Sequence, residues 1–422
     1  MTEQTNYEKA IIVGANFNFR DDFEYSMEEL SNLAKACHLK IVGRVDQNLR
    51  RPQPQYYVGT GKVDEIRLEL ERTDAEIVVF NHELTPSQLR NLEKALNVRV
   101  VDRTNLILEI FEKRAKTREA KLQVEAAHLQ YLLPRLIGSY ESLGRQSGGV
   151  GTKNKGVGEK KLELDRRKVE QKIHDLNKDI ELISVERTTQ RKRRAESELP
   201  GIALVGYTNA GKSTLMNAMV DLYMKRDIKR VFEKDMLFAT LETSVRQIKL
   251  PDNKTFTLSD TVGFVSELPH DLVKAFRATL EEVKNADLLL HVIDYSNDQY
   301  KKQIEVTLET LKEIGADQIP MLYVYNKIDL TDKEPFTDEN AVFISAKQMI
   351  GIEVLIEQIK NRVFKDYVTC LVEVPYDDGK LFSYINDNAY IIETQYLELG
   401  TLLKIECSES MIKKFEGYIV ES

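Results

Sequence analysis

The sequence lacks long apolar runs and is poor in cysteine. No apolar stretch in its 422 residues approaches the roughly 20 that a helix needs to cross a bilayer. The N-terminus, MTEQTNYEKA, is polar and has no signal-peptide core. The three cysteines, Cys37, Cys370 and Cys407, lie far apart, and the six histidines are equally scattered. We therefore expect a cytoplasmic protein without a transmembrane segment, a disulfide framework or a Cys/His metal cluster.

The composition that is present belongs to a globular protein of about two or three domains, with 42% hydrophobic and 30% charged residues. A net charge of −8 by itself disfavours nucleic-acid binding. Residues 111–198, however, carry 21 Lys+Arg against 14 Asp+Glu, a surplus of +7, and the remainder sums to −15. A basic segment inside an acidic chain can attract phosphate locally.

Residues 8–110 alternate short apolar runs with helical patterns. The runs AIIVGANF, LKIVGRV, EIVVF and VRVVD predict strands, and residues 25–37, 61–72 and 86–96 predict helices. Such alternation favours a mostly parallel sheet. The stretch YVGTGKV at 57–63 resembles a fragment of a phosphate loop. Because the full spacing is missing, we expect a turn into a helix there.

Two later segments, 108–136 and 162–183, carry apolar residues at the 4-3 spacing of coiled-coil helices, and Arg118 is the polar slot in the first. Joined by one loop, they predict an antiparallel helical hairpin. The alternative is two amphipathic helices packed on separate domains.

The joining loop, residues 144–161, holds six of the 20 glycines and five basic residues against one acidic residue. A mobile, basic tip suits folded RNA, because phosphates dominate RNA binding. The alternative is a solvated linker. The RNA-binding candidates are Arg145, Lys153, Lys155, Lys160 and Lys161.

Residues 206–213 fit G-x-x-x-x-G-K-[ST] between an apolar strand and a helix. Glycines at 206 and 211 let the backbone wrap phosphates, and the N–H groups of the loop and of the helix N-terminus attract the anion. Lys212 should reach the β- and γ-phosphates, and Ser213 should ligate Mg²⁺. The expected nucleotide contacts in this loop are Gly206, Tyr207, Thr208, Asn209, Ala210, Gly211, Lys212, Ser213 and Thr214.

The sequence LSDTVGF at 258–264 places Asp260 at a strand end, where it would hold Mg²⁺ through water. The N–H of Gly263 can turn toward the γ-phosphate, and we expect nucleotide contacts from Asp260, Thr261, Val262 and Gly263. Residues 237–250 supply a mobile loop whose threonine completes the Mg²⁺ shell, and both Thr240 and Thr243 qualify.

Phe264 stands where Ras-like enzymes place a water-orienting glutamine. Phenylalanine cannot position water. We therefore infer that intrinsic hydrolysis of the bound nucleotide is slow and that fast turnover depends on a partner or on a repositioned group. The alternative is that another side chain of this chain orients the water.

The sequence LYVYNKIDL at 322–330 predicts a strand followed by Asn326-Lys327-x-Asp329. The Asp329 carboxylate can accept both N1–H and the exocyclic amine of guanine, whereas adenine would leave it unpaired at high cost. Asn326 would join the base loop to the phosphate loop, and the Lys327 stem can lie over the ring. In FISAKQ at 343–348, the N–H of Ala346 can donate to guanine O6. The base-binding candidates are Asn326, Lys327, Ile328, Asp329, Ser345, Ala346 and Lys347.

These motifs, together with long stretches between them, resemble the HflX family of ribosome-associated GTPases, in the Obg–HflX group. The resemblance is carried by NHELTPSQLRNLEKALNVRVVDRTNLILEIF (81–111), AKTREAKLQVEAAHLQYLLPRL (115–136), GYTNAGKST (206–214), LFATLETSVR (237–246) and the stretch from DTVGF to HVID (260–294). The sequence departs from the family at the hairpin loop, where GTKNKGVGEKKLELDRR replaces a pattern close to GTRGPGETQLE-x-DRR.

The resemblance implies that Thr240, in preference to Thr243, coordinates Mg²⁺, and that its loop contacts the nucleotide through Phe238, Ala239, Thr240, Leu241 and Glu242. Catalytic roles then fall to Lys212, Thr240 and Gly263, and metal ligation to Ser213, Thr240 and, through water, Asp260. The resemblance also implies a large-ribosomal-subunit partner, contact with ribosomal RNA through the N-terminal domain and hairpin, and splitting or rescue of stalled or idle ribosomes.

We therefore expect an α/β protein in four parts: an N-terminal α/β domain (1–107), a helical hairpin (108–198), a P-loop GTPase domain with a mostly parallel sheet and flanking helices (199–366), and a small α+β domain (367–422). It would hydrolyse GTP with Mg²⁺ and be a monomer when free. One alternative is a GTPase in RNA modification or remodelling that splits no ribosome. Another is a GTP-gated scaffold without enzymatic activity, which Phe264 makes conceivable.

Overall fold

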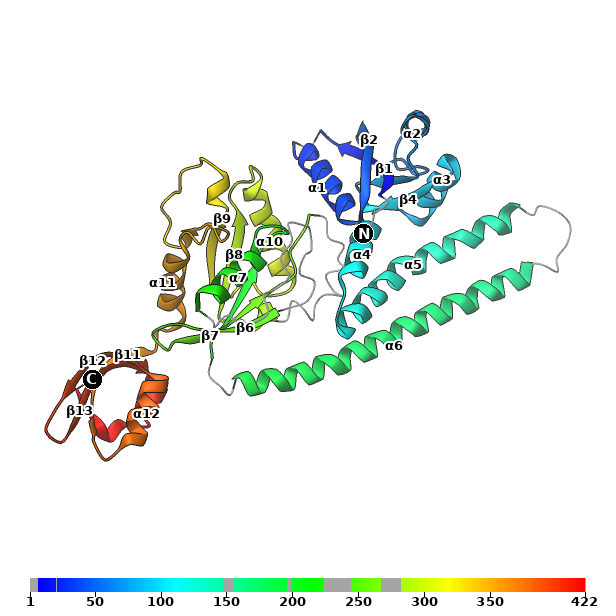
Figure 1. Ribbon diagram of the computed structural model, residues 1–422. Coiled ribbons are helices and arrows are strands. Elements are labelled where there is room, and N and C mark those ends of the chain that lie inside the picture. Colours follow the sequence, from blue (N-terminus) through cyan, green and yellow to red (C-terminus); the bar gives the residue numbers. More distant parts are fainter. Residues whose placement is uncertain are drawn as a thin grey trace, which may run out of the picture. The chain divides into compact units, whose positions relative to one another are not determined.

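The computed structural model describes residues 7–19, 21–146, 155–195, 199–223, 244–266 and 282–421. The chain divides into two compact units. Figure 1 labels helices and strands of both. The first unit comprises Met1–Arg191, Lys234–Glu242 and Gly263–Thr279, and the second comprises Lys192–Glu233, Thr243–Val262 and Leu280–Ser422. Within the described ranges, none of the helices combines the length and the apolar character needed to cross a membrane.

The first unit begins with a four-stranded parallel sheet in the order β2-β1-β3-β4. Its strands are β1 (Glu8–Phe17), β2 (Leu39–Leu49), β3 (Ile77–Phe80) and β4 (Arg99–Asp102), and the helices between them are α1 (Phe23–Ala36), α2 (Thr60–Thr73) and α3 (Pro86–Leu96). Every residue of β3 is buried, as expected for a parallel strand covered on both faces. The parallel sheet predicted from the alternating pattern is confirmed.

The starts of α2 and α3 follow from local chemistry. The Thr85 hydroxyl accepts a hydrogen bond from the Gln88 amide (3.3 Å), and the Gln88 side chain accepts one from the Thr85 amide (3.0 Å). This reciprocal cap, with Pro86 at the first helical position, fixes where α3 begins. Helix α2 begins at Thr60, so the stretch at 57–63 is the turn into a helix that the sequence predicts.

The helical pattern expected over residues 108–136 is interrupted. Helix α4 (Arg103–Arg114) ends before Ala115, whose backbone is extended, and α5 (Arg118–Gln146) begins three residues later. The Thr117 hydroxyl accepts a hydrogen bond from the Ala120 amide at 3.2 Å, which caps the new helix. The polar slot at Arg118 is therefore a helix start.

The expected domain division at 107/108 falls inside α4. The residues on both sides of it, Ile107 and Leu108, are buried in the same helix.

Helix α6 (Lys155–Ala195) runs antiparallel to α5. Ion pairs join Lys172 to Glu125 (2.5 Å) and Asp179 to Arg118 (3.8 Å), and Leu176 is buried between them. The predicted antiparallel hairpin is confirmed, and the alternative of two helices on separate domains is wrong.

The loop between these helices is shorter than the expected 144–161. Helix α5 continues through Gln146 and α6 starts at Lys155, although each glycine in a helix costs roughly 1 kcal/mol relative to alanine. Arg145 is thus a helical residue of α5, and Lys155, Lys160 and Lys161 are helical residues of α6. Lys153 lies outside the described residues.

The second unit holds a six-stranded sheet in the order β10-β9-β8-β5-β7-β6. Its elements are β5 (Gly201–Val205), α7 (Lys212–Tyr223), β6 (Ser244–Lys249), β7 (Thr255–Asp260), β8 (Leu288–Asp294), α10 (Tyr300–Glu313), β9 (Met321–Asn326), η1 (Ile328–Leu330), β10 (Ala341–Phe343) and α11 (Ile352–Val363). Strand β6 pairs antiparallel with β7, and the other strand pairs of this sheet are parallel. The residues that follow β5, β7 and β9 therefore meet at one edge.

The C-terminal part is a smaller antiparallel sheet in the order β12-β13-β11-β14. Its elements are β11 (Tyr367–Pro375), α12 (Gly379–Asn388), β12 (Tyr390–Tyr396), β13 (Gly400–Ser408), α13 (Glu409–Ile412), η2 (Glu416–Tyr418) and β14 (Ile419–Glu421). Alternate residues of the two central strands, such as Val372 and Leu403, form its core. The predicted small α+β fold is confirmed.

Candidate nucleotide-binding site

The loop between β5 and α7 depends on glycine at two positions. Gly206 has φ +142°, and a Cβ there would lie 2.2 Å from the carbonyl oxygen of Val292. Gly211 has φ +95°, and its Cβ would lie 2.2 Å from Nδ2 of Asn326. Both the backbone angles and the close neighbours exclude a side chain. The loop therefore presents bare backbone in front of the N-terminus of α7, where an anion is favoured.

Lys212, the first residue of α7, is buried and folds back onto the loop. Its ammonium donates to the carbonyl oxygens of Gly206 (3.0 Å) and Tyr207 (2.8 Å). Burial lowers the pKa of Lys212 from 10.5 to about 8, against the opposing effect of Asp260. At neutral pH the side chain is therefore mostly charged, and phosphate oxygens can replace the two carbonyl acceptors.

Ser213 and Asp260 lie side by side. Asp260 ends β7 and is fully buried, and the Ser213 hydroxyl donates to its Oδ2 at 2.7 Å. A hydroxyl and a carboxylate are hard oxygen donors of the kind Mg²⁺ takes. Their chemistry and spacing fit the metal. The other predicted ligand, Thr240, and its neighbours from Phe238 to Glu242 lie outside the described residues.

Asn326, at the end of β9, joins two loops. Its Nδ2 donates to the carbonyl oxygen of Ala210 in the phosphate loop (2.9 Å), and its Oδ1 accepts from the Ala346 amide (3.0 Å). The sequence analysis expected that amide to donate to guanine O6, and in this structure it donates to Asn326 instead. The sequence spacing does not show that Oδ1 of Asn326 lies within hydrogen-bond distance of the Ala346 amide.

The residues after Asn326 form a tight turn. Lys327 has φ +66°, and its ammonium pairs with Asp294 Oδ2 at 2.7 Å, an ion pair that the sequence analysis missed. Asp294 ends β8, which pairs with β9 in the sheet, and the sequence alone does not show that these two strands are neighbours. Asp329 follows in η1, and its side chain makes no hydrogen bond or ion pair to the described residues. Its carboxylate is thus available to a base.

Three further residues that the sequence analysis expected to contact the nucleotide, Thr208, Thr261 and Gly263, lie in different surroundings. The Thr261 hydroxyl donates to the carbonyl oxygen of Leu204 at 2.6 Å, so a contact from Thr261 to a nucleotide falls to its backbone. The Thr208 hydroxyl is buried and has no partner among the described atoms. Gly263 follows Val262 in the chain and begins the segment Gly263–Thr279, which belongs to the first compact unit.

His291 on β8 is a further buried group that the sequence analysis missed. Burial and the nearby charge of Lys212 lower its pKa to about 3. It is therefore neutral at physiological pH and adds no positive charge beneath the phosphate loop.

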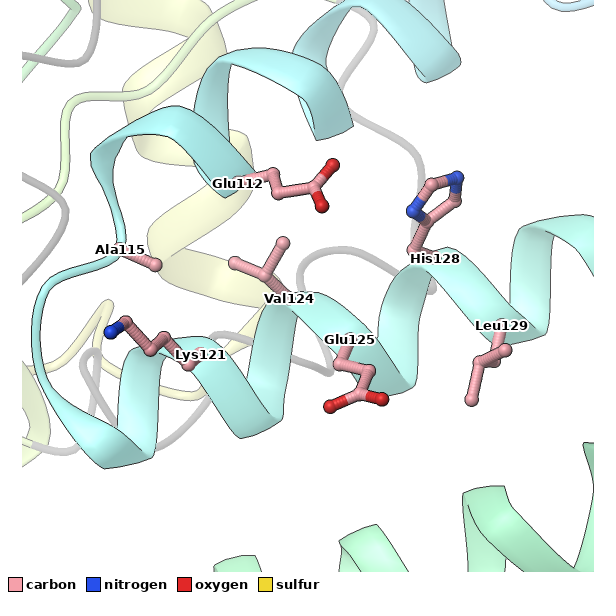
Figure 2. Close-up of a pocket in the computed structure, with 7 residues that line it drawn as sticks. All are labelled: Glu112, Ala115, Lys121, Val124, Glu125, His128 and Leu129. Carbon is pink, nitrogen blue, oxygen red and sulfur yellow. The ribbon is translucent and has the colours of Figure 1, made fainter.

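A separate hollow of about 460 Å³ lies between α4 and α5 in the first unit. Figure 2 shows Glu112 of α4 and His128 of α5 extending into the space between the helices, with Lys121 and Glu125 on α5. The two carboxylates exceed the single lysine, so the hollow lacks the basic surplus that a polyphosphate requires.

A phosphate loop, a strand-end aspartate beside its serine and an Asn-Lys-x-Asp turn together define a P-loop GTPase. Family models agree: residues 24–112 match "GTP-binding GTPase N-terminal", residues 114–194 match "GTP-binding GTPase Middle Region", and residues 201–327 match "50S ribosome-binding GTPase". The junction of the first two matches, at 112–114, coincides with the end of α4.

Relatives extend this match over nearly the whole chain. The GTPase HflX of Caldanaerobacter subterraneus subsp. tengcongensis is 41% identical over 98% of this chain and 94% of its own length. The GTPase HflX of Escherichia coli (strain K12) is 40% identical over 89% of this chain and 88% of its own length. A GTP-binding protein from Sulfolobus solfataricus, solved with GDP, is 24% identical, with a TM-score of 0.44 over 85% of this chain and 99% of that one. The chain belongs to the HflX family of GTPases, and it hydrolyses GTP.

Proposed function

We propose that this GTPase binds the large ribosomal subunit in its GTP state and leaves it after hydrolysis, and that this cycle splits or rescues stalled or idle ribosomes. The matched domain description, which names binding to the 50S ribosome, supports the partner. The near-complete match to relatives named GTPase HflX supports GTP hydrolysis as the step that would drive the cycle. We propose a cytoplasmic location, where ribosomes are found, and a monomeric free state.

The observation that carries the nucleotide part is the convergence of three strand ends. After β5 comes the glycine loop, at the end of β7 lies Asp260 beside Ser213, and at the end of β9 lies Asn326, which donates to the loop carbonyl of Ala210. The Lys212 ammonium would leave two loop carbonyls for the β- and γ-phosphate oxygens. The N–H groups of Gly206 to Ser213 would bind the same phosphates.

Ser213 and Thr240 would hold Mg²⁺ directly, and Asp260 would hold it through water. When bound, the ion neutralises charge on the β- and γ-phosphates. Gly263 would direct its N–H toward the γ-phosphate and so report whether that group is present.

Asp329 would select guanine by accepting N1–H and the exocyclic amine. Asn326 would hold the base loop and the phosphate loop in register, as its two hydrogen bonds already do. The stem of Lys327, held by Asp294, would lie over the ring.

Phe264 has an apolar side chain with 3% exposure and cannot orient the attacking water. We propose that intrinsic hydrolysis is slow and that the large subunit supplies or positions the missing group. Purified large subunits should raise GTP turnover in proportion to their concentration, with small subunits as the control. Unchanged turnover would refute activation by the ribosome.

Sedimentation separates splitting from the rival functions. With GTP, the protein should shift intact ribosomes toward free subunits in sucrose gradients. Intact ribosomes together with retained RNA binding would favour a role in RNA modification or remodelling. Tight GTP binding without single-turnover hydrolysis, even with ribosomes present, would favour a scaffold.

A pull-down tests the switch itself. A non-hydrolysable GTP analogue should retain large subunits on the immobilised protein, and GDP should not. Equal retention in both nucleotides would refute a GTP-dependent ribosome cycle.

A further inference from the structure

A buried arginine in the first unit joins four parts of the chain. Arg103, the first residue of α4, is 2% exposed and ranks first by volume among the fully buried side chains in the described ranges. Its Nη1 donates to Asn81 Oδ1 (3.0 Å), and its Nη2 donates to the Glu29 carboxylate and to the carbonyl oxygen of Ser266 (3.1 Å). Asn81 in turn donates to the Ser26 hydroxyl at 2.8 Å.

These partners differ in how firmly the fold holds them. Glu29 lies on α1, and Asn81 directly follows β3, so both belong to the N-terminal sheet and its helices. Ser266 belongs to no helix or strand. It lies in a turn six residues after Asp260, in the segment that contains Gly263. It lies in the same compact unit as Arg103.

The chemistry of the contact makes it sensitive to backbone position. A guanidinium stays charged when buried and needs its acceptors, so the loss of one is costly. Ser266 accepts through its backbone carbonyl, so the contact depends on the path of the chain rather than on a side chain. A hydrogen bond weakens steeply once the donor and acceptor separate or tilt.

We infer that Arg103 is a positioning residue that couples the nucleotide-dependent path of residues 263–266 to the N-terminal domain. The inference rests on the proposed role of Gly263 at the γ-phosphate. A turn of the Gly263 amide toward that phosphate displaces the carbonyl three residues further on. Arg103 then binds Ser266 more strongly in one nucleotide state than in the other, and by linkage the N-terminal domain changes the relative affinity for GTP and GDP.

The test replaces the buried pair and compares it with a matched surface pair on the same helix. The double variant Glu29→Leu/Arg103→Met removes both buried charges, so neither is left unpaired. The control, Glu24→Leu/Arg44→Met, removes the exposed pair that joins α1 to β2. For each protein, the affinities for a non-hydrolysable GTP analogue and for GDP are measured, along with hydrogen exchange of residues 23–36 and 103–114 in both nucleotide states.

We expect the ratio of the two affinities to change about fivefold or more in the buried-pair variant, since coupling of this kind is typically 5- to 150-fold. Its exchange difference between the two states should vanish, and the control should keep the wild-type ratio and difference. A merely structural role would weaken both nucleotides equally. A folded buried-pair variant with the wild-type ratio and exchange difference would overturn the inference.

A second variant keeps the test decisive if the double variant does not fold. Arg103→Lys retains the charge opposite Glu29, but one ammonium cannot reproduce the fork that reaches Asn81 and Ser266 together. The same change in ratio is expected, and a wild-type ratio overturns the inference. If the wild-type protein binds no GTP, the proposed function itself fails. If the wild type binds GTP and the variant keeps the wild-type ratio of GTP-analogue to GDP affinity, only the inference about Arg103 fails.

Discussion

Two stretches of this chain have similar glycine- and lysine-containing sequences but different backbone conformations. Both the phosphate loop at 206–213 and the stretch YVGTGKV at 57–63 lead into a helix through glycines and a lysine. In the first, Gly206 and Gly211 have positive φ and no room for a Cβ. In the second, a Cβ on Gly61 would meet nothing within 4 Å. Spacing decides whether the backbone curls into an anion-binding loop or simply turns.

The two lysines show the same contrast. Lys212 is buried and donates to two loop carbonyls, so it points where phosphates would bind. Lys62 instead pairs with Glu65, three residues along its own helix, at 2.6 Å. A lysine beside glycine is therefore a phosphate ligand when the loop spacing bends the chain around it, and an ordinary helix residue otherwise.

The largest expected effect comes from Gly211→Ala. The substitution places a methyl group where φ is +95° and where Nδ2 of Asn326 is 2.2 Å away. It should displace both the loop and the Asn326 contact, and weaken GTP binding by about 100-fold or more, since strain and a lost buried hydrogen bond together cost several kcal/mol. Titration with fluorescent GTP measures the change.

Gly61→Ala is the matched control, made in the look-alike stretch. It should leave GTP affinity unchanged and stabilise α2 by roughly 0.5–1 kcal/mol, because alanine is the better helix former. Loss of GTP binding in this variant would show that 57–63 takes part in the nucleotide site.

Asp329→Asn should have the next largest effect. The amide cannot accept both guanine donors, so GTP affinity should fall about 100-fold and xanthosine triphosphate should bind better than GTP. Competition titrations with the two nucleotides measure the exchange of preference. Asp332→Asn, three residues along, is the control, and unchanged GTP affinity in the Asp329 variant would show that the base contact is misassigned.

A pH dependence distinguishes the two lysines further. Because the pKa of buried Lys212 is lowered to about 8, the nucleotide-free site loses its charge above that pH. GTP affinity should then fall by up to about tenfold per pH unit. The sign for stability is opposite: between pH 8 and 10.5 the unfolded chain holds the proton and the folded chain does not, so folding becomes more favourable as pH rises.

Lys212→Met should remove both trends, whereas Lys62→Met should remove neither. Measurements of GTP affinity and of the unfolding midpoint between pH 7 and 10 test the pair. A wild-type affinity that stays flat through pH 9 would contradict the lowered pKa of Lys212.

The parts of the molecule that the sequence predicted are those set by near neighbours in the chain. The four N-terminal strands, the helix at 86–96 and the phosphate loop each depend on patterns within a few residues. The α4–α5 break was missed because the apolar spacing continues across Thr117. The Thr117 hydroxyl caps the start of α5, and this contact is seen only in the structure.

Contacts between distant residues could not be predicted in this way. The donation from Ala346 to Asn326 and the pair between Lys327 and Asp294 need the positions of three strand ends. The buried Arg103 has partners 74 and 163 residues away, and no local pattern connects them. The sequence therefore predicted the nucleotide-binding motifs but not the hydrogen bonds and ion pairs that hold their loops in position.

The hairpin end gives the smallest expected effect, and it contrasts with the phosphate loop in mechanism. The phosphate loop would bind anions through its backbone, whereas the hairpin end (residues 144–161) has basic residues in its sequence, so its contribution should be additive and sensitive to salt. Lys160→Gln/Lys161→Gln should weaken large-subunit binding by roughly threefold per lysine and lower the slope of log affinity against log salt by about two. Lys168→Gln, further along α6 and already paired with Asp165 (3.7 Å), is the control. GTP affinity should stay unchanged in both variants. An unchanged salt slope in the double variant would show that this end of the hairpin makes no phosphate contact, and would leave ribosome binding to other surfaces of the protein.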